Sequence, residues 1–409
     1  METQKFLKLP HLPAFPFNPV SKNTLPTTVK APLSSTSTRR TVLLSHHPSI
    51  TPKREKDAKK RVVITGMGIV SVFGSDADKF YERLLTGESG ISLIDRFDAS
   101  ELTTRFGGQI RGFKSNGYID GKMDQRLDDC QRYCIVAGKK ALEDAAISGD
   151  KLSNIDKERA GVLVGSGLGG ATLFHNGVKS LIERGYRKIT PFLIPYQISN
   201  SASALLAIDL GFMGPTRILS KRNDDPQTAG GVEAAVVPIG VAAFASLGAL
   251  SKRNDDPQTA SRPWDKDRDG FVLGEGAGVL VMESLEHAMK RDAPILAEYL
   301  GGAVNCDAHH VTSPRSDGFG VSSCIQRCLA NASVSVEEVN YINAHATSTI
   351  LGDIAEANAL KNVFKNTTGI KMNATKVNSL WLILLQHQLH THIIFLFNRN
   401  GSFSELFDH

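Results

Sequence analysis

Cysteine is scarce in this sequence, and its spacing excludes two common uses. The chain of 409 residues has five cysteines and no Cys-x-x-Cys pair. A zinc ribbon or a dithiol redox site needs such pairs, so both are excluded. Cys130 and Cys134 are four residues apart, as are Cys324 and Cys328, so the members of each pair share a helix face. This spacing is typical of small, reduced core residues. The five are Cys130, Cys134, Cys306, Cys324 and Cys328.

Acidic residues are almost absent from the first 52 residues, where Glu2 is the only one. This segment is rich in Ser, Thr and Pro, carries Arg39 and Arg40, and has no long apolar stretch like that of a secretory signal. The composition is typical of an organelle transit peptide. We therefore expect residues 1–52 to be a disordered targeting segment. The alternative is a disordered tail that has no targeting function.

Excess positive charge is confined to the same end of the chain. Residues 1–60 carry 11 Lys or Arg and 3 Asp or Glu, whereas the remainder carries 36 and 39. A mildly acidic body gives no reason to expect nucleic-acid binding. Two apolar runs near the carboxyl end, 380–385 and 393–397, are far too short to span a bilayer. We predict neither a nucleic-acid partner nor a membrane partner.

Strand and helix signals alternate along the body and predict an α/β layered fold. Apolar, β-branched runs predict strands, and capping residues followed by helical patterns predict helices. The expected strands are 61–65, ending in a glycine turn, and 160–164, 295–304 and 339–342. The expected helices are 76–85, 124–147 and 352–364.

One histidine stands where such folds place their chemistry. His345 follows the expected strand 339–342 and precedes a helix, between the small residues Ala344 and Ala346. Open α/β sheets bind ligands at the carboxyl ends of their strands, and an imidazole exchanges protons near neutral pH. A histidine in this position is a candidate for acid–base or oxyanion chemistry. The alternative is a hydrogen-bonded core histidine.

Three long motifs carry a family resemblance. They are RVVITGMG at 61–68, PWDKDRDGFVLGEGAG at 263–278, and NAHATST at 343–349 followed by GDxxE and NATK. In this order the motifs resemble the β-ketoacyl-[acyl-carrier-protein] synthases, and most of all the plastid members from plants. The resemblance covers about residues 53–376. It implies a thiolase-like fold of two similar halves in five αβαβα layers.

The resemblance also implies a domain division. An amino-terminal half would span residues 53–294, with a break at 216–229. A partial carboxyl-terminal half would span 295–376, so that the second half is incomplete. Residues 377–409 depart from the family and are expected to be an aberrant, unrelated tail. His387, His390 and His392 in that tail could bind a metal, but no Cys or carboxylate partner is nearby, so we predict no metal site.

Two other motifs suggest different chemistry. Residues 165–170, GSGLGG, match G-x-G-x-x-G after a strand, with Glu183 near the position of a ribose-binding acid. This would indicate a nicotinamide oxidoreductase, but the strand is not the first of a βαβ unit. The run DKDRDG at 265–270 resembles the start of a calcium loop, yet position twelve is Gly276 rather than Glu. We expect neither a dinucleotide nor calcium, and no other cofactor.

The break is a duplication. The eleven residues LSKRNDDPQTA occur at 219–229 and again, unchanged, at 250–260. The flanking sequences differ, which argues against a structural repeat. The second copy leads into the motif at 263 as the family requires, so the first copy is interpreted as the inserted one. In the resembling enzymes this segment carries a Thr-Ala-Cys-Ala turn with the nucleophilic cysteine, and here it has no cysteine.

The resemblance assigns site residues by motif. His345 would be one of two histidines that stabilise the malonyl thioester oxygen, Lys376 the active-site lysine, and Glu356 a carboxylate hydrogen-bonded to that lysine. Thr347 and Thr349 would hold the pantetheine arm of the substrate. The alternatives without a catalytic role are a surface lysine at a strand end for Lys376 and an acidic residue on a helix face for Glu356.

The resemblance further implies function and partners. The family condenses an acyl thioester with malonyl-[acyl-carrier-protein] in fatty acid biosynthesis, with loss of CO2, so the partners would be acyl carrier protein and a second copy of the chain in the plastid (chloroplast) stroma. Without the cysteine and the second histidine, this chain as written is expected to be inactive. The alternative function is a non-catalytic fragment that associates with an intact synthase subunit.

Overall fold

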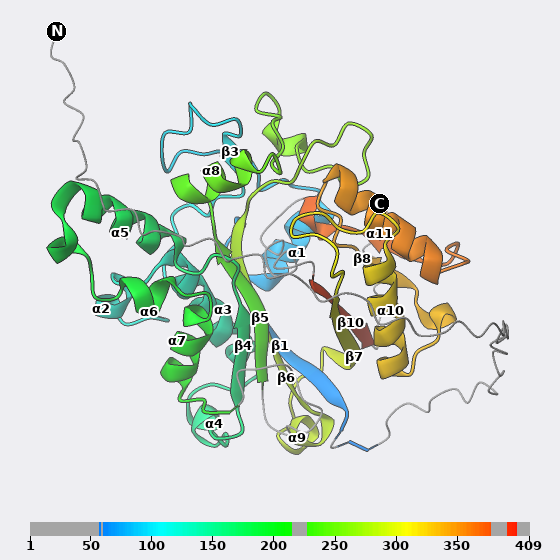
Figure 1. Ribbon diagram of the computed structural model, residues 1–409. Helices are drawn as coiled ribbons and strands as arrows, with labels where there is room; N and C mark the ends of the chain where they lie inside the picture. The colour runs from blue at the N-terminus through cyan, green and yellow to red at the C-terminus, as the bar shows by residue number, and fades with distance from the viewer. Residues whose placement is uncertain (1–56, 59, 215–226, 378–390, 399–409) are drawn as a thin grey trace, which may run out of the picture. The chain divides into compact units, whose positions relative to one another are not determined.

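The computed structural model describes residues 57–58, 60–214, 227–377 and 391–398 (Figure 1). The expected transit peptide and most of the inserted copy lie outside these residues. Six strands form the main sheet, in the order β10-β7-β1-β6-β5-β4. They are β1 (Val62–Val70), β4 (Gly161–Gly165), β5 (Gln227–Ala234), β6 (Glu275–Ser284), β7 (Ala297–Cys306) and β10 (Thr391–Asn398).

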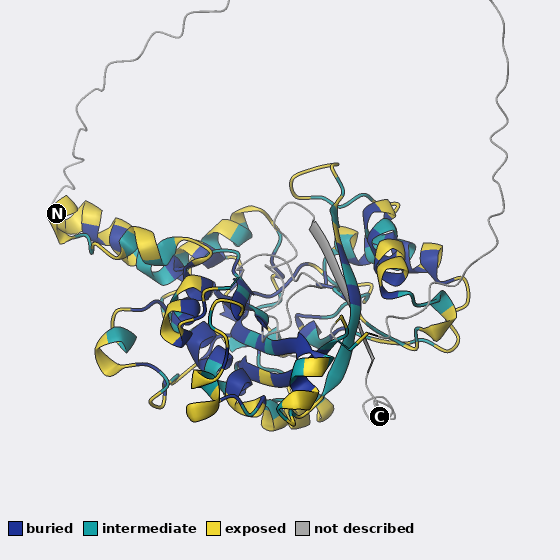
Figure 2. Cartoon of the chain, turned by 90° about the horizontal axis from the view of Figure 1, so that it is seen from below, coloured by how far each residue is buried: buried dark blue, intermediate teal, exposed yellow. Residues whose placement is uncertain are grey.

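Four of the five neighbouring pairs in this sheet are antiparallel. Strand β6 is antiparallel to both β1 and β5, and β7 is antiparallel to β1 and β10. Strands β4 and β5 are parallel, joined by a long crossover with helices. The sheet is therefore mixed, and its central strands are buried (Figure 2).

The helices of the first half cover the sheet and its ends. They are α1 (Ala77–Leu85), α2 (Gly121–Asp124), α3 (Asp129–Asp144), α4 (Asp150–Ser153), α5 (Ala171–Arg184), α6 (Leu193–Gln197), α7 (Ser201–Leu210), α8 (Pro238–Ser246) and α9 (Leu285–Lys290). Short 3-10 turns are η1 (Tyr186–Lys188) and η2 (Pro257–Thr259), and a small hairpin pairs β2 (Ser92–Leu93) with β3 (Phe106–Gly107). The cap of the first helix is as expected: Asp76 accepts a hydrogen bond from Lys79 N.

Helix α3 lies directly on the sheet, and this corrects two predicted boundaries. We expected a turn at Gly66–Gly68, but β1 continues through both glycines to Val70. A Cβ on Gly68 would lie 1.9 Å from Ala137 O, so the glycines admit the helix backbone, and the pairing of β1 with β6 shifts register between Ile64 and Gly66. The predicted helix 124–147 is divided, because the carboxylate of Asp128 caps α3.

The second half is built around two long helices. Helices α10 (Phe319–Ala332) and α11 (Ile350–Val363) pack together around Ile325, Leu329 and Leu360. Strands β8 (Tyr341–Asn343) and β9 (Lys371–Asn373) are parallel and form their own two-stranded sheet, and the remaining turns are η3 (Val336–Glu338) and η4 (Thr375–Val377). Within the described ranges, β8 and β9 do not join the sheet that contains β7.

The predicted tail contributes one element to this fold. Strand β10 pairs with β7 along its length, from Thr391 opposite Cys306 to Asn398 opposite Glu298. Part of the segment 377–409 therefore adds to the main sheet, although the segment departs from the family in sequence. The division at 294–295 and the aberrant origin of the tail stay predictions. None of the described helices has the length and apolar character that crossing a membrane requires.

Candidate active site

The turn after β8 carries His345 and is held by a carboxylate from the next helix. Ala344 N donates to Asn373 O at 2.7 Å, which prolongs the pairing of β8 with β9 into the turn. His345 N and Ala346 N then donate to the two carboxylate oxygens of Glu356, at 2.8 and 2.7 Å. Glu356 lies in the second turn of α11, so its carboxylate joins the histidine turn to that helix.

Lys376 holds the same turn from the other side. Its ammonium group is buried and donates to Ala344 O at 2.9 Å, while Lys376 O accepts from Ser261 Oγ at 3.0 Å. Burial lowers the pKa of Lys376 to about 8, although the nearby carboxylates of Glu356 and Asp353 oppose that shift. Lys376 is thus a buried residue of the site, not a surface lysine at a strand end.

The structure brings His345, Lys376 and Glu356 together, with one difference from the expected contacts. We expected a hydrogen bond between Glu356 and Lys376. Instead Glu356 accepts backbone N–H groups and Lys376 donates to a backbone C=O. Burial raises the pKa of Glu356, and the two N–H donors and Lys376 act against that shift. Both side chains therefore act on the turn backbone at residues 344–346.

The two threonines contact each other. Thr347 Oγ1 and Thr349 Oγ1 are 3.1 Å apart. Thr347 is fully buried, whereas Thr349 is half-buried and precedes the first residue of α11. Only Thr349 presents surface to a substrate in this conformation. Their role in holding a pantetheine arm stays a prediction.

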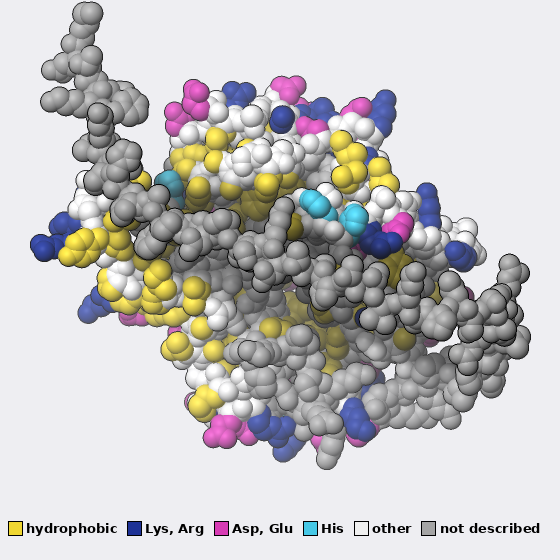
Figure 3. Space-filling model, in the orientation of Figure 1, with side chains coloured by type: hydrophobic (Ala, Val, Ile, Leu, Met, Phe, Trp, Pro, Cys, Tyr) yellow, Lys and Arg dark blue, Asp and Glu magenta, His cyan; other side chains and the backbone are white. Residues whose placement is uncertain are grey.

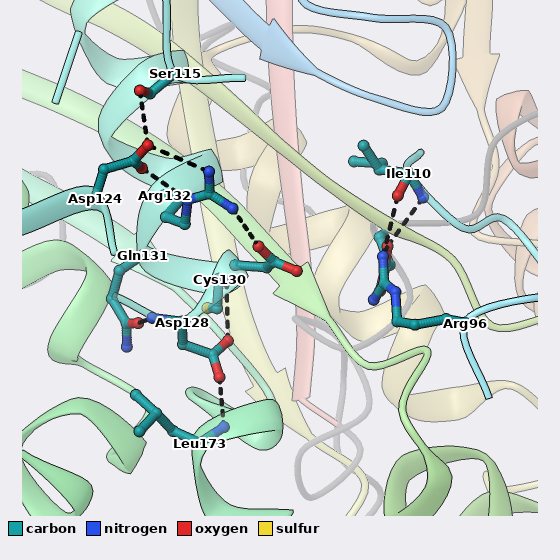
Figure 4. Close-up of polar contacts among 11 residues, drawn as sticks. Arg96, Ile110, Ser115, Asp124, Asp128, Cys130, Gln131, Arg132 and Leu173 are labelled. Atoms are coloured by element: carbon teal, nitrogen blue, oxygen red, sulfur yellow. Dashed lines mark hydrogen bonds and ion pairs between the residues drawn. The ribbon is translucent and has the colours of Figure 1, made fainter. Parts of the chain in front are cut away.

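The glycine-rich turn 165–170 is occupied by carboxylates from within the protein. The buried Glu233 accepts from Gly167 N at 2.8 Å and from Leu168 N at 3.2 Å. Asp128 accepts from Cys130 N at the start of α3 and from Leu173 N in the first turn of α5, at 3.1 and 2.8 Å (Figure 4). Burial raises the pKa of Asp128 to about 6 and that of Glu233 to about 7.

This arrangement argues against a dinucleotide site. A pyrophosphate needs the free N–H groups of such a turn and helix end, and here two acidic side chains take them. Glu183, the candidate ribose ligand, is exposed on α5 and lies 4.0 Å from Lys179. The turn is a structural connection held by internal acids.

The aspartates of the calcium-like run do not converge on a common point. Asp265 accepts from Asp267 N at 2.7 Å, and Asp269 accepts from Lys252 N at 2.8 Å. Arg268 lies between them in sequence and pairs with Asp353 on α11. Among the residues that the structure describes, no three His, Cys, Asp or Glu side chains are placed to hold a metal ion.

The cysteines do not replace the missing nucleophile. Four are buried in the core, and burial raises the pKa of each of these thiols: to about 11 for Cys324, to about 12 for Cys134 and Cys328, and well above the usual thiol value for Cys130. Cys130 is near the amino end of α3, where a helix dipole favours a thiolate, but Glu233 and Asp128 lie close and oppose ionisation. Cys306 is exposed at the end of β7.

Sequence analysis did not single out the contacts of Asp353 and Arg268. Asp353 is the acid of the GDxxE motif, is fully buried, and accepts from Trp264 N at 2.9 Å. The available signal was the acid inside an otherwise helical apolar pattern. Its ion-pair partner, Arg268, lies 85 positions earlier in the chain, and no local sequence pattern reveals a contact over that separation.

Known proteins are similar to this chain over most of its length. The family described as "Beta-ketoacyl synthase, N-terminal domain" matches residues 59–220 and 217–288, and "Beta-ketoacyl synthase, C-terminal domain" matches 296–379. The two segments of the first match overlap at residues 217–220, where the first duplicated copy begins. Together the matched segments span the described body of the chain.

Curated relatives and solved structures agree. The chain is 69% identical to the chloroplastic 3-oxoacyl-[acyl-carrier-protein] synthase I of Arabidopsis thaliana over 343 residues, which is 80% of this chain and 72% of that protein. It is 64% identical to the corresponding enzyme of Hordeum vulgare over 348 residues, 80% of this chain and 75% of that one.

A crystal structure of a β-ketoacyl synthase from Burkholderia phymatum STM815 is 29% identical, with a TM-score of 0.70 over 80% of this chain and 84% of that one. These similarities confirm the thiolase-like fold class predicted from the motifs. The chain belongs to the β-ketoacyl synthase family.

Proposed function

We propose that this chain is a 3-oxoacyl-[acyl-carrier-protein] synthase of plastid fatty acid biosynthesis by descent. The observation that carries the proposal is the His345 turn, whose backbone is held by Glu356 on one side and Lys376 on the other. In the proposed reaction, the imidazole of His345 hydrogen-bonds the thioester oxygen of the malonyl group. Loss of CO2 leaves a carbanion that attacks the acyl thioester, and the product is a 3-oxoacyl chain two carbons longer.

We also propose that the polypeptide as written does not form the acyl-enzyme. The reaction needs a thiolate that accepts the acyl group, and the segment 215–229 contains no cysteine. The four buried thiols have raised pKa values, and Cys306 is outside the His345 turn. Without the nucleophile, the remaining site can contribute only the stabilisation of the malonyl thioester.

Mass spectrometry tests this proposal. The full chain is mixed with acyl and malonyl acyl carrier protein, and both the chain and the carrier are weighed. We expect no acyl adduct and no elongated product, but a slow loss of CO2 from malonyl carrier protein that falls in His345→Gln and not in His309→Gln, an exposed control. An acyl adduct on any cysteine would overturn the inactivity, and decarboxylation insensitive to His345→Gln would remove the role of His345.

We also propose a partner, a location in the cell and an oligomeric state. Acyl carrier protein is the partner that presents the substrate; one structural neighbour, 29% identical with a TM-score of 0.69, is a ketosynthase in complex with an acyl-carrier protein. The chloroplastic relatives and the composition of residues 1–52 support import into the plastid, with the stroma as the destination. The proposed oligomeric state is a homodimer.

Exposed apolar side chains on α5 and α6 support self-association. Ile182 on α5 is 79% exposed, Tyr186 on the intervening turn η1 is 71% exposed, and Ile194 on α6 is 67% exposed. Figure 3 shows hydrophobic side chains gathered over these helices, on the left of the view. An apolar surface of this kind on a folded chain favours a protein interface.

A non-catalytic subunit is the second candidate function. The absence of a nucleophilic cysteine favours it, and the exposed apolar surface of α5 and α6 gives it a means of pairing with an intact synthase. Co-expression with an intact chloroplastic synthase tests this. A stable one-to-one complex that forms in preference to either homodimer would support the subunit, and separate elution of the two chains would reject it.

A further inference from the structure

We propose that Arg268 is a positioning residue, which sets the backbone of the turn that carries His345. Its catalytic meaning rests on the function proposed above, but the geometric claim does not. Arg268 belongs to the loop 262–270 of the first half, whereas the turn 344–350 belongs to the second. The proposal is that this loop acts as a clamp across the two halves.

The guanidinium of Arg268 reaches the backbone at the end of the turn. Nε donates to Thr349 O at 3.1 Å and Nη2 donates to Ile350 O at 2.9 Å. Nη1 donates back to Asp265 O at 2.6 Å, within its own loop. The side chain is only 10% exposed, and its bond to Thr349 O is partly buried. A planar fork of fixed donors suits two adjacent carbonyl groups, and a lysine ammonium cannot reproduce it.

The charge of Arg268 is matched by Asp353. Nε lies 3.3 Å from Asp353 Oδ2, and Asp353 is fully buried on α11. The same carboxylate accepts from Trp264 N at 2.9 Å, so the loop holds it at two points. Glu356 follows three residues later on the same helix and holds His345 N. A fixed position of α11 relative to the loop therefore fixes the carboxylate that orients the histidine turn.

The clamped turn contains a strained residue. Ser348 has a φ of +68°, a left-handed conformation that residues other than glycine rarely adopt. It is fully buried, and the loop holds it from both ends: Gly270 N donates to Ser348 O, and Arg262 N donates to Ser348 Oγ, each at 3.1 Å. Such a conformation persists only where neighbouring groups over-determine it. Arg268 adds a further restraint, because it donates to the carbonyl of Thr349, the next residue.

A histidine NMR signal tests the clamp without any use of catalysis. The full chain is labelled at histidine, and the His345 resonance is identified by its loss in His345→Gln. We expect Arg268→Lys to move the His345 imidazole resonance and to change its titration midpoint by about 0.3 pH units or more. Arg315→Lys is the matched control, because Arg315 forms an exposed pair with Asp317 and does not touch the turn.

The outcomes separate this inference from the proposed function. An unchanged His345 resonance and titration in Arg268→Lys overturns the clamp, and equal changes in Arg315→Lys do the same. Arg268→Gln removes the charge as well and is expected to give a larger change. If that variant unfolds, Arg268→Lys still decides the question because it keeps the pairing charge for Asp353. Failure of the decarboxylation assay would leave this result unaffected.

Discussion

Lys376 shows how a single residue of the site is kept at a cost to stability. Its ammonium group is buried, donates one hydrogen bond to Ala344 O, and has its pKa lowered to about 8 by burial. Below that pH the folded protein must hold a positive charge that is better solvated in the unfolded chain. The cost is about 3 kcal/mol, from a shift of 10.5 to about 8 at 1.36 kcal/mol per pH unit. Sites retain such costs where chemistry needs the group.

Replacement of this lysine should stabilise the protein near neutral pH. A lowered lysine pKa means that the folded state binds fewer protons than the unfolded state between pH 8 and 10.5, so wild-type stability rises across that window. Lys376→Met removes the penalty and one hydrogen bond, for a net gain of about 2 kcal/mol at pH 7. Urea unfolding at pH 7 and pH 10 measures it.

Two results identify the cause. The gain of Lys376→Met should shrink by pH 10, because the wild type is then largely relieved of its charge. Lys361→Met, an exposed control on α11, should change stability little at either pH. A Lys376→Met variant that is destabilised equally at both pH values would show that the ammonium stabilises the fold and carries no burial penalty.

Much of the site could be predicted at this scale, because long motifs identify residues one by one. His345, Lys376 and Glu356 were each expected in the site, and they meet at one turn. The bond expected between Glu356 and Lys376 was wrong, since backbone groups of the turn lie between them. The roles of Arg268 and Asp353 were missed, because their contacts join segments far apart in the chain.

At the scale of elements, the duplicated segment has two structures. In the first copy, Gln227 to Ala229 begin β5, between β4 and β6. In the second copy, the corresponding residues are Gln258 to Ala260, and the first two of them belong to the 3-10 turn η2. Local propensity is the same for both, so the surrounding structure decides. Strand β5 satisfies its polar side chains with β4: Gln227 Nε2 donates to Arg159 O at 3.0 Å, just before that strand.

The same substitution in the two copies should therefore have different effects. Thr228 is fully buried and donates to Gly161 O at 3.2 Å, whereas Thr259 is exposed and bonds Asp256. Thr228→Ala leaves a small cavity and an unpaired carbonyl, and should cost about 1–3 kcal/mol. Thr259→Ala should cost about 0.5 kcal/mol or less. Thermal unfolding of both variants measures this, and equal losses would contradict the assignment of the first copy to β5.

At the scale of the molecule, the apolar surface of α5 and α6 requires cover. Exposed apolar residues continue along this region, through Leu181 and Ile198. Single exposed apolar residues are normal on a monomer, but apolar residues gathered in one region favour an interface. A second copy of the chain is the cover we propose.

Charge placed on this surface should dissociate the dimer. Ile182→Asp puts a carboxylate at a position that is 79% exposed in the single chain. We expect the wild type to sediment as a dimer at micromolar concentration and the variant as a monomer. Dimerisation of the variant would bury an unpaired carboxylate, and the free-energy cost of that burial exceeds the stabilisation from the apolar contact. Met289→Asp on α9, at a position 66% exposed, is the control and should remain dimeric. A monomeric wild type would reject the homodimer.

The sequence by itself determined the family, the fold class, several of the strands and helices, and the residues of the histidine turn, because caps, periodicity and long motifs are local. Tertiary structure alone decided the passage of β1 through Gly66 and Gly68, the two conformations of one repeated segment, and the clamp of Arg268 on the second half. Each of these depends on a backbone group supplied by a distant segment, and a local sequence pattern holds no record of that group.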